Sequence, residues 1–377
     1  MKTEKTSVNI VGMIGTQRET VSNARATVSV FGGGINPGSE LPRGIDPDYI
    51  LEFARAHEDS DFDMVLTGYS SSTPDGFEVT NYAAGHTKRI GFLIAHRPGF
   101  IMPTLAARKI ATLDQLTQGR IALHIISGGS DKEQRSDGDW INHDARYRRT
   151  DEYMGLLRRI WREREPFDHE GEFYRFEDVY SQVRCFQDPN VPLFFGGASD
   201  IALEVGSKRA DVFALWGEPL SAIKERITDI TNRALSHNRK IKFSLSVRPI
   251  IGVTESEAWA RAESILQQVQ QATLGKIDPG QPARLQSEGS RRLLRFAEQR
   301  DVHDDRLWMP IASASGAAGS TTCLVGTAEQ VADSLMKYFD LGCDTFIIRG
   351  FDPLQDAKEY GKDLIPLIRQ KASNRMC

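Results

Sequence analysis

Short apolar runs alternate along this chain with longer stretches that carry apolar residues at helical spacing. Most of the runs are continuously apolar, which is typical of parallel strands covered on both faces. The runs span residues 8–14, 63–67, 91–96, 121–126, 191–195, 211–216, 243–251 and 344–348. Helical patterns lie at about 46–60, 74–86, 103–118, 145–163, 199–209, 219–237, 254–273, 327–341 and 352–371. Such regular alternation over more than ~250 residues predicts an α/β fold, a single TIM (β/α)8 barrel rather than two small domains.

Three stretches do not follow this alternation and are interpreted as insertions in the barrel. Residues 17–45 are too rich in glycine for a helix. Residues 164–190 alternate around Gly171 and predict a surface β-hairpin without a catalytic role. Residues 274–326 precede the last strand and predict a mobile lid, because long loops in compact domains are often lids or binding loops. The alternative for the first and third stretches is mobile decoration without function.

Composition and charge narrow the class of protein. The chain has 377 residues, of which 40% are hydrophobic and 26% charged, as in an ordinary globular protein. A net charge of −4 does not favour a nucleic acid or a membrane surface as partner. The four cysteines form no pattern typical of a metal site, and the first residues lack the long apolar run of a signal peptide or membrane span. We therefore expect a cytoplasmic protein without a structural metal.

Two turns rich in glycine and serine follow neighbouring strands and predict an anion site. Ser127-Gly-Gly-Ser130 follows the fourth run, and Gly196-Gly-Ala-Ser199 follows the fifth and begins a helix. The loops after the strands form the active rim of a TIM barrel, and the amides of a helix N-terminus favour a phosphate. Glycines that serve turn geometry alone are the alternative. Neither turn matches the Rossmann or P-loop motif.

Several short motifs, in order along about 350 residues, carry a resemblance to a known family. They are Leu105-Ala-Ala-Arg108, Ala111-Thr-Leu-Asp114, Gly119-Arg120, Ser127-Gly128, Arg146-Tyr147, Phe195-Gly-Gly-Ala-Ser-Asp200, Trp216-Gly-Glu-Pro219 and Leu324-Val-Gly326. The chain resembles the bacterial luciferase-like flavin-dependent monooxygenases, and among them the alkanesulfonate monooxygenase branch. The resemblance implies a TIM barrel that assembles as a homodimer or homotetramer. It also implies O₂ as co-substrate and FMN that arrives reduced from a separate NAD(P)H:flavin reductase.

The same resemblance implies a flavin site. Tyr69 and Ser70, after the second strand, are at positions that contact the flavin in similar enzymes, and His124 and Glu133 are at positions that face the isoalloxazine ring. Positions on the phosphate side and in the two turns complete the set: Ser127, Gly128, Arg146, Tyr147, Gly197, Ala198 and Ser199. His124 as a satisfied core histidine remains the alternative, as does Arg146-Tyr147 as a solvated helix start with a packing tyrosine.

The substrate end departs from the alkanesulfonate pattern. On the seventh strand, where that branch has an arginine and a histidine, this chain has Ser246 and Arg248. Gln17 replaces a histidine after the first strand, Thr73 replaces a cysteine, and Phe351 is an aromatic residue without a phenol hydroxyl. In the lid, Ser315-Gly-Ala317 stands where the branch has an arginine. Because several sulfonate ligands change together, the organic substrate stays open.

Residues at the strand ends are the candidates for substrate chemistry. Arg248, with Gln17 and Trp216, is a candidate catalytic residue, and Arg97, Arg349, Phe351 and Thr73 are candidate substrate residues. Guanidinium groups suit carboxylate, sulfonate and phosphate. The alternatives are ion pairs with carboxylates at the rim for the arginines and a core position for Trp216. His96 should point away from Arg97 in a regular strand.

Three functions remain to be separated. The leading hypothesis is a two-component monooxygenase that uses reduced FMN to oxidise a small anionic or sulfur-containing organic compound, with a sulfonate or another organosulfur compound among the candidates. An oxidoreductase dependent on the deazaflavin F420 is the second hypothesis, and a non-catalytic flavin-binding barrel is the third. A hydrolase built on a metal cluster or a carboxylate pair is not favoured by any motif.

Overall fold

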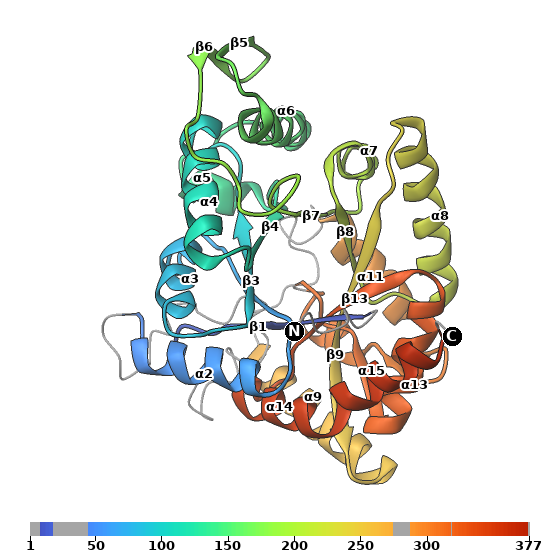
Figure 1. The fold of residues 1–377 in the computed structure, drawn as a ribbon. Coiled ribbons are helices and arrows are strands. Elements are labelled where there is room, and N and C mark those ends of the chain that lie inside the picture. Colours follow the sequence, from blue (N-terminus) through green and yellow to red (C-terminus); the bar gives the residue numbers. More distant parts are fainter. Residues whose placement is uncertain (1–7, 18–43, 274–286, 318, 376–377) are drawn as a thin grey trace.

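The computed structural model describes residues 8–17, 44–273, 287–317 and 319–375, and it is a closed barrel of eight parallel strands (Figure 1). Each strand overlaps one of the predicted apolar runs. The strands are β1 (Asn9–Met13), β2 (Met64–Thr67), β3 (Gly91–His96), β4 (Ile121–Ile125), β7 (Leu193–Gly196), β8 (Val212–Trp216), β9 (Lys242–Gly252) and β13 (Cys343–Ile348). They pair in this order, and β13 closes the ring on β1. The TIM barrel is confirmed.

Helices surround the strands, as the alternation predicted. They are α2 (Pro47–Asp59), α3 (Gly76–Ala84), α4 (Pro103–Thr117), α6 (His143–Arg162), α7 (Asp200–Arg209), α8 (Leu220–Ser236), α9 (Glu255–Thr273), α13 (Ala328–Asp340), α14 (Pro353–Glu359) and α15 (Ile365–Asn374). Local capping explains several starts: Asp75 accepts hydrogen bonds from the first amides of α3, and Thr327 forms a capping box with Gln330 in α13. The short α5 (Asp131–Ser136) was not predicted, because six residues are too few to show a helical period.

The insertion at 274–326 contains more regular structure than predicted. Its described part forms α11 (Glu288–Gln299), β10 (Val302–His303), β11 (Leu307–Trp308), α12 (Pro310–Ala314) and β12 (Cys323–Thr327). The second half of β9 leaves the barrel and pairs in parallel with β12, so that Arg248 lies beside Cys323. The interpretation of the whole segment as a loop is therefore wrong. Its mobility stays a prediction, and residues 274–286 lie outside the described residues, as do residues 18–43 of the first insertion.

The predicted hairpin is present on the surface. Strands β5 (Phe167–Glu170) and β6 (Arg175–Val179) pair antiparallel, apart from the barrel sheet. No helix among the described residues is long and apolar enough to cross a membrane. Within that same part of the chain, His, Cys, Asp and Glu side chains do not gather in threes as they would around a metal ion.

The barrel interior holds a layer of apolar side chains. This layer consists of Val11, Met13, Leu66, Leu93, Ala95, Ala122, Phe194, Val212 and Ile347. A larger core lies between the outer face of the strands and the helices, where Phe92, Phe195 and Phe213 are completely or almost completely buried. Four residues of the inner layer, Met13, Leu66, Ala95 and Ile347, also line a cavity at the carboxyl ends of the strands, together with His124 and Trp216.

Candidate active site

A cavity of about 630 Å³ occupies the carboxyl-terminal mouth of the barrel. Most of the predicted site residues line it, namely Arg97, His124, Ser127, Gly128, Glu133, Tyr147, Gly197, Ala198, Ser199, Trp216, Arg248 and Arg349. Ser130 and Ser199 line the same cavity, so the two predicted turns lie at one end of the barrel. Gln17, Tyr69, Ser70, Thr73, Arg146 and Phe351 are not part of the lining.

The turn after β4 is shaped by a glycine in the left-handed region. Gly128 has φ +90°, and a Cβ atom there would lie 1.4 Å from Nε2 of Gln134. Gln134 is fully buried and donates from Nε2 to the Ser127 carbonyl, at 3.3 Å. The Ser127 hydroxyl forms a hydrogen bond with the Thr150 hydroxyl at 2.9 Å. The turn therefore needs glycine both for its backbone conformation and for the close approach of Gln134.

The turn after β7 brings the start of α7 to the cavity. Ser199 is the N-cap of this helix, and its side chain accepts no hydrogen bond from the amides of the first turn. A Cβ atom on Gly197 would lie 2.5 Å from Cβ of Ala202 and 3.2 Å from the Tyr147 hydroxyl oxygen. Burial raises the pKa of Tyr147, so its phenol is protonated at neutral pH. Amides at a helix start and a phenol beside them form an environment that favours an anion.

Arg146, which the resemblance places on the phosphate side, is not part of the cavity lining. Its guanidinium group donates from Nη1 to the Ile141 carbonyl and from Nη2 to Asp131, both at 2.8 Å. The side chain is 2% exposed. Arg146 therefore joins α5 to the start of α6, because its position in the first turn of α6 points it at the loop rather than at the cavity.

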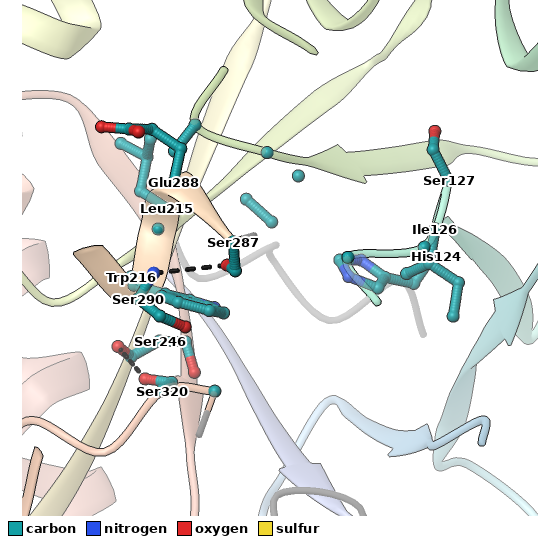
Figure 2. Close-up of a pocket in the computed structure, with 18 of the residues that line it drawn as sticks. His124, Ile126, Ser127, Leu215, Trp216, Ser246, Ser287, Glu288, Ser290 and Ser320 are labelled. Carbon is teal, nitrogen blue, oxygen red and sulfur yellow. Dashed lines mark hydrogen bonds between the residues drawn. The ribbon is translucent and has the colours of Figure 1, made fainter. Parts of the chain in front are cut away.

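His124 and Trp216 lie on opposite sides of the cavity (Figure 2). Burial lowers the pKa of His124 to about 4, so the imidazole is neutral at physiological pH. Its Nδ1 atom is buried and has no hydrogen-bond partner among the described residues. The Trp216 indole packs against α11, where a Cβ atom on Gly289 would lie 2.8 Å from its Cζ3 atom.

Two of the residues that hold Arg97 at the cavity, Glu133 and Tyr69, were themselves predicted to contact a flavin. Its Nη2 atom lies 3.0 Å from Oε1 of Glu133, and its Nη1 atom lies 3.7 Å from Oδ2 of Asp137. The guanidinium group lies over the Tyr69 ring, and the Tyr69 hydroxyl donates to Asp137 at 2.7 Å. Tyr69 thus lies behind Arg97 and not on the cavity surface, since its ring supports the guanidinium group.

Ser70 and Thr73 form a turn rather than part of the cavity wall. The Ser70 amide donates to the Thr73 hydroxyl at 2.9 Å, and that hydroxyl donates to the Ser70 carbonyl at 3.1 Å. Gln17 is buried, and its Nε2 atom has no hydrogen-bond partner in the described part of the chain. His96 points out of the barrel to the Tyr153 hydroxyl, as the alternation with Arg97 predicted.

The β9 side of the cavity carries Arg248 and two serines. Arg248 is 3% exposed and donates to the carbonyls of Ser320 at 3.2 Å and Gly350 at 3.4 Å. The Ser320 hydroxyl donates to the Ser246 carbonyl at 2.8 Å (Figure 2). Phe351 lies behind Arg248, which separates it from the cavity. Of the lid residues Ser315, Gly316 and Ala317, only Gly316 is in the lining.

Residues 287–290, here called the roof, cover part of the cavity from the start of α11. Gly289 packs on Trp216 from β8, and a Cβ atom on Gly129, after β4, would lie 3.9 Å from Cβ of Ser287. The roof therefore spans the mouth between these two strand ends. The Ser290 hydroxyl fixes it further by donating to the Ala317 carbonyl at 2.8 Å.

Comparisons with known proteins agree with this geometry. The family model for luciferase-like monooxygenases matches residues 27–345, most of the chain. The chain belongs to the luciferase-like monooxygenase family. The protein is accordingly an enzyme of the flavin-dependent monooxygenase class, as its motifs predicted.

Solved structures of low sequence identity share the fold of this luciferase-like monooxygenase. A riboflavin lyase, crystallised with modified FMN and riboflavin, is 20% identical with a TM-score of 0.78 over 97% of this chain and 92% of that one. EDTA monooxygenase from Chelativorans sp. BNC1 is 16% identical with a TM-score of 0.73 over 97% and 94%. An F420-dependent secondary alcohol dehydrogenase is 17% identical with a TM-score of 0.63 over 85% and 95%.

Two cavity residues of this luciferase-like monooxygenase that the sequence did not predict, Arg226 and His143, come from helices. Arg226, in the middle of α8, lines the cavity at 9% exposure and donates to the Gly197 carbonyl at 3.1 Å. His143 lines it from the first turn of α6, 4.8 Å from the Tyr147 ring. A search of strand ends could not find them, because nothing in a helical pattern distinguishes a cation that faces a cavity from one that faces solvent.

Proposed function

We propose that the protein binds reduced FMN in this cavity and uses O₂ to oxidise a small organic anion. The supporting observation is the division of one cavity into two parts. Its anion-binding end is formed by the start of α7 with Tyr147 and Arg226. The rest of its lining is largely apolar and includes the ring of Trp216 and the neutral ring of His124. A flavin mononucleotide has the same division, since a dianionic phosphate is joined to a planar ring.

The residues present fit such a group. A cavity of about 630 Å³ is in the range of sites for ligands of this kind. The buried Nδ1 atom of His124 lacks a partner in the described part of the chain, and buried polar atoms usually have one. A heterocycle with N–H and C=O groups at its edge would supply that partner. The Arg226 guanidinium group beside Gly197 would pair with the phosphate.

In this proposal a bound reduced flavin supplies the electrons that activate O₂ and the route by which one oxygen atom reaches the substrate. The protein binds the flavin and the substrate, orients them and excludes water. The roof covers the mouth, which limits the access of water to the ring. His124 stays neutral above about pH 4, so it holds its ring proton on one nitrogen and offers the other as an acceptor.

Arg248 and Arg349 are the proposed contacts for the organic anion. Both line the cavity and are less than a tenth exposed, and guanidinium groups suit carboxylates and sulfonates. Ser246 lies beside them, where the alkanesulfonate branch has a basic side chain. We therefore favour an organic anion as the class and keep the sulfonate as one member to be tested.

The test is a titration of the anaerobic protein with reduced FMN, followed by oxygenation with a panel of sulfonates, sulfinates, sulfones, carboxylates and amines. We expect saturable binding, O₂ uptake equal to the product formed, and sulfite only if a sulfonate is the substrate. Arg248→Ala should lower turnover more than flavin affinity. Unchanged oxidation of the true substrate by this variant would discard the role of Arg248, and absence of flavin binding would discard the proposal.

The same experiment, repeated with reduced F420 in place of reduced FMN, separates the competing functions. An F420-dependent oxidoreductase, which the similarity to the F420-dependent dehydrogenase keeps open, would bind reduced F420 and transfer a hydride without O₂ uptake. A non-catalytic flavin-binding barrel would bind reduced FMN and form no product with any member of the panel. The separate NAD(P)H:flavin reductase and the homodimer or homotetramer stay predictions of the family resemblance, and the cytoplasmic location stays a prediction of the sequence.

A further inference from the structure

A buried carboxylate lies in the same cavity as the proposed phosphate-binding end. Glu218 follows β8, lines the cavity and is 4% exposed. Arg292 of α11 engages both of its oxygens, with Nε 2.8 Å from Oε1 and Nη2 2.6 Å from Oε2. The Glu218 carbonyl also accepts a hydrogen bond from the Tyr338 hydroxyl at 2.9 Å. The backbone of Glu218 is therefore fixed, and its charge is compensated by a bidentate partner.

Arg226 is a second buried arginine in this cavity. It lines the cavity, and its Nη2 atom donates to the Gly197 carbonyl at the start of α7. Burial lowers the pKa of Arg226, the Glu218 carboxylate opposes this effect, and the Arg292 charge adds to it. The two arginines thus interact electrostatically with the same carboxylate, although only Arg292 forms the bidentate pair.

A dianionic phosphate at the start of α7 would compete with this carboxylate for the charge of Arg226. An uncompensated Glu218 would repel the phosphate, and it would also attract the Arg226 charge that the phosphate needs. A buried carboxylate without a partner is costly, so its nearest remaining cation would be drawn to it. The bidentate pair with Arg292 removes both problems, because it occupies the two oxygens of Glu218 from the side of α11.

We propose that Arg292 is a positioning residue that neutralises Glu218 and thereby makes the cavity selective for a phosphorylated flavin over riboflavin. The inference depends on the proposed function, since it requires flavin in this cavity. It also connects cofactor choice to α11, the helix that begins with the roof. Arg292 does not itself line the cavity, so its effect passes through Glu218.

The experiment measures dissociation constants for reduced FMN and reduced riboflavin under anaerobic conditions, with the ratio of the two as the readout. Arg292→Gln should weaken FMN binding by about tenfold or more and leave riboflavin binding within about threefold. Glu218→Gln should keep the preference for FMN, and the double variant Glu218→Gln/Arg292→Gln should restore it, because no carboxylate then needs a partner. Rescue by the double variant also shows that loss of folding did not cause the effect.

Arg295→Gln is the matched control. It removes another ion pair of α11, from Arg295 to Glu288 at 3.0 Å, and leaves Glu288 its second partner, Arg291. This variant should not change the ratio. An equal loss of FMN and riboflavin affinity in Arg292→Gln, or a double variant without rescue, would overturn the inference. A wild-type protein that binds neither flavin would instead overturn the proposed function.

Discussion

The guanidinium carbon of Arg248 lies 4.7 Å from the centroid of the Phe351 ring. Arg248 belongs to β9 and Phe351 follows β13, so the contact joins two neighbouring strands. Phe351 is 9% exposed and does not line the cavity. The aromatic residue that the family resemblance assigned to the substrate therefore supports an arginine that faces the cavity.

Phe351→Leu should weaken the binding of an anionic substrate without affecting flavin. Leucine keeps most of the apolar volume but lacks the π face, which is worth ~1–2 kcal/mol when the cation is desolvated. We expect KM for the substrate to rise about five- to thirtyfold, with kcat within a factor of about two. Steady-state kinetics with a substrate from the panel and a reduced-FMN titration test this. Phe351→Tyr keeps the ring and should behave as wild type; an unchanged KM in Phe351→Leu would remove the supporting role.

Gly128→Ala should lower the free energy of unfolding by more than the cost of placing alanine at a positive φ. The new methyl group would displace the buried amide of Gln134 and open its hydrogen bond to the Ser127 carbonyl. Gly138 is a matched control: its φ of +85° is close to the +90° of Gly128, but a Cβ atom there would meet no heavy atom of the described residues within 4 Å. We expect Gly138→Ala to cost ~1 kcal/mol and Gly128→Ala to cost ~3 kcal/mol or more.

Urea unfolding of both variants and a reduced-FMN titration provide the measurements for this pair. Gly128→Ala should also bind flavin more weakly, because Ser127 and Gly128 line the cavity, whereas Gly138 does not. Equal losses of unfolding free energy in the two variants would mean that Gln134 moves aside at no cost.

The barrel could be predicted from sequence because buried parallel strands are continuously apolar and the runs recur between helical patterns. The turn glycines Gly128 and Gly197 could be found for a related reason, since they follow those runs directly. Strand β12 could not, because Cys323–Thr327 lies outside the regular alternation of runs and helices and pairs with the part of β9 that has left the barrel. Arg146 and Arg226 show the same limit at the site: both are buried helix arginines, and only the packing of α6 and α8 decides which one reaches the cavity.

Gly289→Ala should disturb the roof through Trp216. A Cβ atom at position 289 would lie 2.8 Å from Cζ3 and 3.1 Å from Cε3 of the indole, so the ring or the start of α11 must move. We expect reduced-FMN affinity to fall about tenfold, with a loss of ~1–3 kcal/mol in unfolding free energy from overpacking. Gly85→Ala is the control, because Gly85 does not line the cavity, has a φ of −66°, and its Cβ atom would first meet the Asn81 carbonyl oxygen at 3.6 Å. Wild-type affinity in Gly289→Ala would show that the indole position does not matter for the flavin.

The free energy of unfolding should fall between pH 7 and pH 5, because buried histidines take up protons less readily in the folded state than in the unfolded state. Burial lowers the pKa of His57 and of His96 from 6.5 to about 4, and the two side chains are 2% and 4% exposed. In the unfolded chain both titrate near 6.5, so the unfolded state binds more protons as the pH falls toward 4. Each histidine should cost about 2 kcal/mol of unfolding free energy by pH 5.

Asp356 acts in the opposite sense, since burial raises its pKa to about 6 and its protonation favours the folded state in acid. The decisive measurement is therefore the difference in unfolding free energy between wild type and His96→Gln, because the contribution of Asp356 is the same in both proteins and cancels. Urea unfolding at several pH values from 7.5 to 5 gives this difference. Glutamine keeps a hydrogen bond to the Tyr153 hydroxyl, which lies 2.7 Å from Nε2 of His96, but does not titrate. The variant should lose less stability on acidification, by about 1.4 kcal/mol per pH unit once His96 of the unfolded wild type is protonated. Parallel curves for the two proteins would mean that His96 takes up its proton in the folded state.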